Sequence, residues 1–124
     1  AYWSLEGYEN KPEFTGVIRI PADAFYPVAR RAHELGWQLG IHTMGDGAAV
    51  MVVDHIERIL RELPREDHRH YLHHVAVKPP QATIDKMARL GIGVASQPAS
   101  SSVVSKTKRV VIAARPCLGS GYFK

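Results

Sequence analysis

"LGIHTMGDGAAVMVVDHIERIL", residues 39–60, passes from a short apolar run through a histidine and a Gly-Asp-Gly turn into a long amphipathic stretch. The apolar run is typical of a buried strand, and apolar residues three and four positions apart predict a helix over residues 46–62. His42 and Asp46 stand where the strand gives way to the helix. Such junctions commonly display catalytic groups, because the strand fixes the side chain while the loop leaves it accessible.

The same alternation of helix and strand extends on both sides of this stretch. Residues 20–36 have helical spacing, and residues 79–91 form another such segment, opened by prolines and closed by a glycine. Strands are predicted near residues 37–43, 70–77 and 92–96. Alternation of this kind favours an α/β fold with parallel strands joined by right-handed crossovers. A repeat of about 30 residues is typical of a barrel or of a doubly wound sheet.

Length and composition are those of one soluble globular domain, with 124 residues of which 45% are hydrophobic. The longest apolar runs fall far below the roughly 20 residues needed to cross a bilayer, so we expect no membrane span. The N-terminus has no basic region followed by an apolar core, so no secretory signal is expected. Cys117 is the one cysteine, which excludes an internal disulfide and fits a cytoplasmic location.

Charge is unevenly distributed along the chain. Through Asp85 there are nine Lys and Arg against twelve Asp and Glu, a net charge of −3, whereas the remainder has seven basic residues and no acidic one, a net charge of +7. A basic segment can contact nucleic acid, but aromatic interleaving and a recognition helix are missing, so we do not expect that partner. We therefore divide the chain into βα units over residues 1–99 and a divergent basic segment over residues 100–124.

Seven histidines occur in the chain, four of them in HRHYLHH over residues 68–74. His42 and His74 each lie near the end of a predicted strand. If those strands are parallel neighbours, both imidazoles emerge at the same edge of the sheet, where they are suitable ligands for a divalent metal such as zinc. The alternative is that they are surface or hydrogen-bonded residues, since two ligands do not complete a tetrahedral site.

Three motifs follow one another at the ends of the predicted strands. HTMGDGA matches an H-A-x-G-D-x-A pattern at His42, Gly45, Asp46 and Ala48. RHYLHH matches an R-H-x-x-E-H pattern at Arg69, His70 and His74. An S-x-Q-P pattern matches Ser96, Gln97 and Pro98, with one position fewer between Ser and Gln. In this order they resemble the metal-dependent amidohydrolase superfamily, in its branch of N-acyl and N-formyl amide hydrolases. The resemblance covers roughly residues 16–99 and implies a partial TIM-type barrel, because a complete barrel takes about 250 residues.

The resemblance also implies roles for individual residues. His42 and His74 match the metal-ligating histidines, and the implied chemistry is attack of a metal-activated water on an amide or related carbonyl carbon of a small molecule. Asp46 is a candidate catalytic residue that could orient a ligand, or could instead cap the following helix. His70 is a second candidate catalytic residue that could hydrogen-bond substrate or support the ligands, or could be a polar residue on a strand face.

The chain departs from the family pattern at several points. His73 stands where the family usually has Glu. The family's strand-one H-x-H pair, its bridging lysine and its strand-eight aspartate cannot be located, and from Ser100 onward the resemblance ends. About three of eight barrel units are therefore expected.

Two other functions are compatible with the residues. A serine hydrolase could use Ser96 or Ser101 with a histidine and Asp46 on esters, although no G-x-S-x-G elbow is present. The chain could also be a non-catalytic binding module. In either case three βα units leave two open sheet edges, so we expect a homo-oligomer. No role is assigned to three further histidines, which are His33, His55 and His68.

Overall fold

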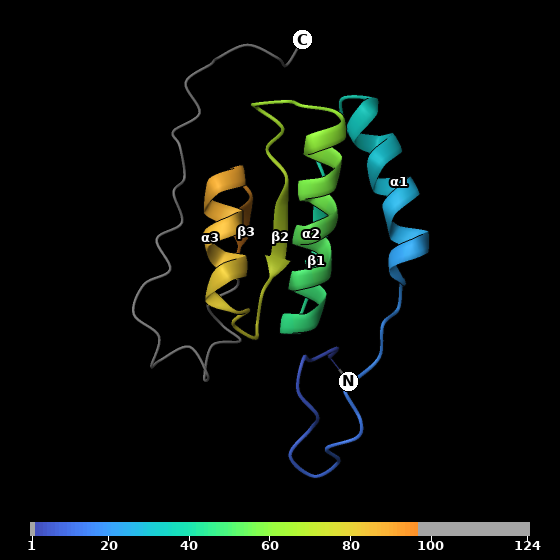
Figure 1. The fold of residues 1–124 in the computed structure, drawn as a ribbon, viewed down its shortest axis with the longest axis vertical. Coiled ribbons are helices and arrows are strands. Elements are labelled where there is room, and N and C mark those ends of the chain that lie inside the picture. The colour runs from blue at the N-terminus through green and yellow to red at the C-terminus, as the bar shows by residue number, and fades with distance from the viewer. Residues whose placement is uncertain (1, 97–124) are drawn as a thin grey trace.

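The computed structural model describes residues 2–96, in which helices and strands alternate along the chain (Figure 1). In chain order the elements are α1 (Ala22–Glu34), β1 (Gly40–Thr43), α2 (Asp46–Glu62), β2 (Tyr71–His74), α3 (Gln81–Leu90) and β3 (Gly93–Ala95). The predicted alternation, with a helix over residues 46–62, is confirmed. The basic segment over residues 100–124, together with Gln97, Pro98, Ser101 and Cys117, lies outside the described residues.

The three strands form one parallel sheet in the order β1-β2-β3. Ile41 pairs with Leu72, Leu72 pairs with Val94, and one step further along β1, His42 pairs with His73. The predicted parallel pairing is confirmed. Because each strand follows its helix in the same direction, the carboxyl ends of all three strands meet at one edge of the sheet.

The hydrophobic core lies between the sheet and the helices. Leu72 is fully buried, and Ile41 and Val94 from the neighbouring strands pack against the same cluster. Helix α2 supplies most of the cluster, because its apolar residues recur at helical spacing along one face. Full burial of each valine, leucine, isoleucine or methionine of the cluster stabilises the fold by about 1.5–3 kcal/mol relative to exposure. The buried members are Ala49, Val52, Val53, Ile56, Leu72, Met87 and Ile92.

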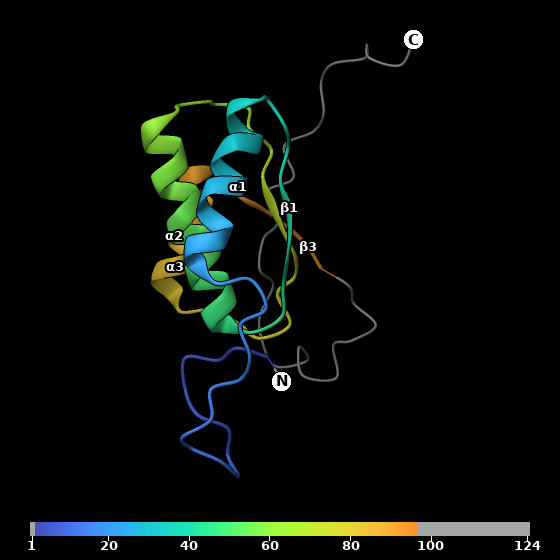
Figure 2. The ribbon, with the colours of Figure 1, turned by 90° about the vertical axis from the view of Figure 1, so that its right-hand side faces the viewer.

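All three helices cover the same face of the sheet, and the opposite face carries none of them (Figure 2). In a doubly wound sheet helices cover both faces, whereas in a TIM-type barrel they form an outer layer around the strands. The alternation of helices and strands was compatible with a barrel or a doubly wound sheet. The sequential strand order and the helices on one face identify the barrel. The open face of the sheet corresponds to the interior of a barrel.

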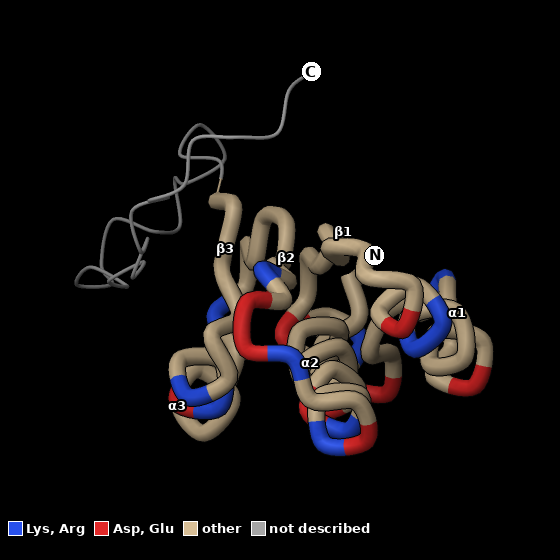
Figure 3. Tube along the Cα trace, turned by 90° about the horizontal axis from the view of Figure 1, so that it is seen from above, with Lys and Arg blue, Asp and Glu red and all other residues tan. Residues whose placement is uncertain are grey.

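Charged residues occur along the three helices and in the loop before β2 (Figure 3). None of the strand residues is charged. Across the helices, Lys86 of α3 lies 2.7 Å from the carboxylate of Asp54 and 2.8 Å from that of Glu57, both in α2. Within residues 2–96, no helix is long and apolar enough to cross a membrane.

Candidate metal centre

His42 and His74 meet at the carboxyl edge of the sheet. Their ring centroids are 4.7 Å apart with the rings inclined at 72°, so that the edge of one ring faces the other. His42 is the third residue of β1 and is exposed, and His74 is the last residue of β2 and is half-buried. Both rings are therefore accessible from the open face of the sheet.

The backbone at the end of β2 explains how His74 reaches His42. Strand alternation would place His74 on the same side as Leu72, toward the helices. Instead His74 has a φ of 69° and Val75 a φ of 50°, so two successive residues adopt the left-handed conformation. This turn ends the strand and carries the His74 ring to the open face, where it also lies 5.9 Å from the ring of His73.

The pair fits part of a metal site. A histidine nitrogen binds zinc at about 2.0–2.1 Å, so two rings sharing one ion would have centroids about 5 Å apart. The observed separation of 4.7 Å between His42 and His74 agrees with this. Among residues 2–96 there is no group of three or more His, Cys, Asp or Glu side chains that could hold a metal. Any further ligands must therefore come from outside these residues or from water.

Asp46 is the first residue of α2, as expected, and its carboxylate is used within the chain. Its Oδ1 atom accepts the backbone N–H of Gly47 at 2.9 Å, which satisfies a free amide of the first helical turn. The same oxygen accepts the N–H of Leu5 at 3.1 Å and so anchors the N-terminal segment. The N-cap position of α2 is held by Gly45, so Asp46 bonds within the first turn without being the N-cap residue. The catalytic role of Asp46 stays a prediction.

The N-terminal segment packs closely on the turn between β1 and α2, which the sequence did not indicate. A Cβ atom on Gly45 would lie 1.8 Å from the carbonyl oxygen of Trp3, and one on Gly47 would lie 3.1 Å from its indole ring. The approach of the Trp3 backbone therefore requires a glycine at position 45, and the indole ring leaves little room for a side chain at Gly47. Trp3 belongs to the surroundings of the site, and only the two glycines could have hinted at it.

His70 lies at the other end of β2, on the helical side, and is 1% exposed. The backbone N–H of Leu39 donates to His70 Nδ1 at 3.0 Å, so that nitrogen carries no proton. The proton is then on Nε2, which donates to His33 Nδ1 at 2.8 Å. His33 in turn donates from Nε2 to the carbonyl oxygen of Leu63 at 2.8 Å. Its position away from the open face favours a structural role for His70, whose catalytic role stays a prediction.

His68 completes this buried histidine cluster of His33, His68 and His70. Its Nδ1 accepts the backbone N–H of His70 at 2.9 Å, and its Nε2 donates to the carbonyl oxygen of Leu90 at 2.7 Å. The cluster joins the C-terminal ends of the three helices to the start of β2. Burial lowers the pKa of His33 and lowers the pKa of His70 to about 3, so both imidazoles are neutral at pH 7.

Two further side chains lie near the pair of His42 and His74 on the open face. The rings of Tyr71 and His73 are 4.8 Å apart, and His73 is the register partner of His42. Tyr71 lies across Gly40, where a Cβ atom would meet its hydroxyl group at 2.5 Å. His73 places an imidazole where the family pattern has a glutamate, and Tyr71 adds a phenol beside it.

The serine-based alternative gains no support from the described residues. Ser96 follows β3 at an exposed position, and within residues 2–96 no hydrogen bond joins it to Asp46 or to a histidine. Ser101 lies outside the described residues.

Comparison with known proteins gave a family and two similar folds. The model of the amidohydrolase family matches residues 1–114. An uncharacterized metal-dependent hydrolase from Pyrococcus furiosus shares 21% identity at a TM-score of 0.63, covering 77% of this chain and 19% of its own. One from Pyrococcus horikoshii OT3 shares 16% identity at a TM-score of 0.63, covering 78% of this chain and 18% of its own. No curated protein matched.

These likenesses agree with the one-sided helices and sequential strands described above, and the described residues form part of a TIM-type barrel. The chain spans about a fifth of the length of either solved structure. The division of the chain at residues 99 and 100 stays a prediction.

Proposed function

Because the chain belongs to the amidohydrolase family, we propose that it supplies part of the active site of a metal-dependent hydrolase acting on amide or related carbonyl bonds, esters included. The observation that carries the proposal is the contact of His42 and His74 at the carboxyl ends of adjacent parallel strands. Active sites of TIM-type barrels lie at this end. The two nitrogen donors are suitable ligands for a divalent cation, which we propose to be zinc. Such a cation would activate water as a Lewis acid.

The chain's own residues have distinct proposed roles in this site. His42 and His74 hold the cation through ring nitrogens. Tyr71 and His73 lie on the same open face and offer hydrogen-bonding groups to a small-molecule carbonyl substrate. Asp46 orients the turn that carries the site and is the carboxylate available for proton transfer, since it lies at the same edge.

His70 has a different proposed role, as a supporting residue. Its three hydrogen bonds hold the start of β2 from the helical side. Through that strand it supports His74, and it does not contact substrate.

The experiment is hydrolysis of a simple amide and a simple ester by the 124-residue chain, with added Zn²⁺ and with a chelator. We expect activity that the chelator abolishes and that His42→Ala and His74→Ala each reduce at least tenfold, since each loses one of few ligands. His55→Ala, a half-buried histidine of α2, is the matched control and keeps the parental rate. Activity that survives both the chelator and His42→Ala would contradict the proposal and favour a serine-based mechanism.

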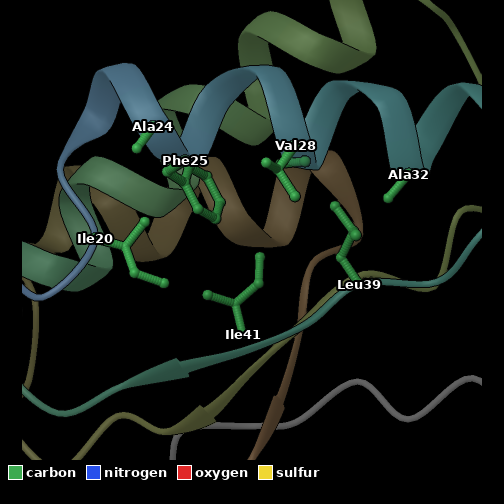
Figure 4. Close-up of a pocket in the computed structure, with 8 residues that line it drawn as sticks. Ile20, Ala24, Phe25, Val28, Ala32, Leu39 and Ile41 are labelled. Carbon is green, nitrogen blue, oxygen red and sulfur yellow. The ribbon is translucent and has the colours of Figure 1, made fainter.

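We further propose that the chain associates with a second copy of itself. An open apolar groove of about 170 Å³ lies between α1 and β1, where Phe25, Val28 and Ile41 face one another (Figure 4). Val28 is 71% exposed, and the outer edge of β1 pairs with no strand among residues 2–96. In a complete barrel a neighbouring βα unit covers both features, and in the 124-residue chain studied by itself a second copy would cover them. Light scattering should give a dimer or larger species, and Val28→Glu should shift it toward monomer. A parental chain that is monomeric at high concentration would contradict this.

A further inference from the structure

We propose that Thr43 is a positioning residue that holds the ring of His74 beside His42. The inference rests on the proposed function, because the pair matters only if it binds a cation. Thr43 is the last residue of β1, follows His42 directly, and is the register partner of His74. It is 1% exposed, so its hydroxyl group is kept from solvent and bonds within the chain.

Thr43 binds the peptide groups on both sides of His74. Its hydroxyl donates to the carbonyl oxygen of His73 at 3.1 Å, and its own carbonyl oxygen accepts the N–H of Val75 at 2.9 Å. These two peptide groups define the φ and ψ angles of His74. The N–H of Val75 also donates to the carbonyl oxygen of His73 at 3.0 Å. Thr43 on β1 and this local bond together hold the backbone conformation from which the His74 ring projects.

The conformation that Thr43 holds is one the chain does not adopt without restraint. A left-handed φ is unfavourable for any residue with a Cβ atom, and most of all for a β-branched one such as Val75. Relaxation of His74 to an extended conformation would return its ring to the side of Leu72, away from His42. Such strained backbone persists only where surrounding contacts over-determine it, and it concentrates at binding sites.

The result is a pair of ligands arranged before the cation arrives. Hydrogen bonds that orient metal ligands typically change metal affinity by about 10–100-fold when they are removed. The hydroxyl bond of Thr43 acts on the backbone of one ligand and lies next in sequence to the other. Its removal lets the His74 ring leave His42 while the parallel pairing of β1 and β2 remains.

The test uses Thr43→Val, which keeps the shape of the side chain and removes its hydroxyl group. Thr43→Ser, which keeps the hydroxyl group, is its counterpart. Thr83→Val is the matched control, because Thr83 is a buried threonine of α3 that is remote from β1. Zn²⁺ affinity is measured by competition with a chromophoric chelator. The nuclear Overhauser effect between the rings of His42 and His74 is measured in the metal-free chain. Thr43→Ala serves as a second variant without the hydroxyl, since the family pattern has alanine at this position.

We expect Thr43→Val to bind Zn²⁺ about tenfold more weakly and to lose the ring-to-ring effect. Thr43→Ser and Thr83→Val should keep both. A folded Thr43→Val or Thr43→Ala chain that retains the ring contact and the parental affinity would overturn the proposal. A parental chain that binds no Zn²⁺ while Thr43→Val still loses the ring contact would refute the metal site alone and leave the positioning role intact.

Discussion

Replacing His70 by Gln tests the buried histidine cluster through the pH dependence of stability. In the folded chain, burial lowers the pKa of His70 from 6.5 to about 3, so the ring stays neutral at pH 5. In the unfolded chain the ring takes up a proton below pH 6.5. The unfolded state therefore binds more protons, and stability falls as the pH falls. Between pH 7 and pH 5 this amounts to about 2 kcal/mol from His70 alone.

Between pH 5 and pH 7 the two carboxylates with the most strongly lowered pKa values do not change their contribution to stability. The hydrogen bond from Lys86 lowers the pKa of Glu57 to about 2, and the hydrogen bond from Tyr26 does the same for Glu62. Their contributions to stability are therefore present above pH 4.5 and are lost only below it. His33, whose pKa burial also lowers, acts in the same direction as His70.

The assay is urea unfolding of the 124-residue chain at pH 5, 6 and 7 at constant ionic strength. Between pH 7 and pH 5 the free energy of unfolding of His70→Gln should fall by about 2 kcal/mol less than that of the parental chain. The substitution should also cost about 1–3 kcal/mol at pH 7, because the Leu39 N–H loses its acceptor. His55→Gln, which removes an imidazole outside the cluster, is the matched control variant. An unchanged slope in His70→Gln would refute the assignment of a neutral, buried His70.

Two other substitutions test the packing. Gly45→Ala places a Cβ atom 1.8 Å from the carbonyl oxygen of Trp3, so the N-terminal segment should move away. We expect this to lower the free energy of unfolding by about 1 kcal/mol. The displacement is followed by the fluorescence of Trp3 in a Trp37→Phe background. An unchanged emission spectrum would contradict this. Leu72→Ala should lower the free energy of unfolding by about 2–5 kcal/mol, because Leu72 is fully buried, whereas Val17→Ala, at an exposed residue, should change it by less than about 0.5 kcal/mol. Equal effects of the two would show that the core lies elsewhere.

The helices and the parallel sheet could be predicted because their signals are local. Apolar spacing set the helix over residues 46–62, and prolines and glycines marked its neighbours. The strands are shorter than expected, with β2 ending at His74 and not at residue 77. The cause is the left-handed turn at His74 and Val75, which depends on contacts with Thr43 and is not encoded in strand propensity.

The surroundings of the site depended on contacts between distant residues. The sequence analysis predicted that His42 and His74 lie at one edge of the sheet, and the structure brings them together. It gave no reason to join His33 to His70, which are 37 positions apart, or Leu5 to Asp46, which are 41 apart. Such long-range partners bear on whether a polar residue serves chemistry or structure, and no spacing rule contains them.

The most direct test of the central claim is a Zn²⁺ titration followed by nitrogen-15 NMR of the histidine rings of the 124-residue chain. If His42 and His74 bind one cation together, their ring signals shift together and saturate at one equivalent. The signals of His33, His68 and His70 stay in place, because their nitrogens are already hydrogen-bonded. Shifts confined to other histidines, or His42 and His74 signals that do not respond, would contradict the metal centre.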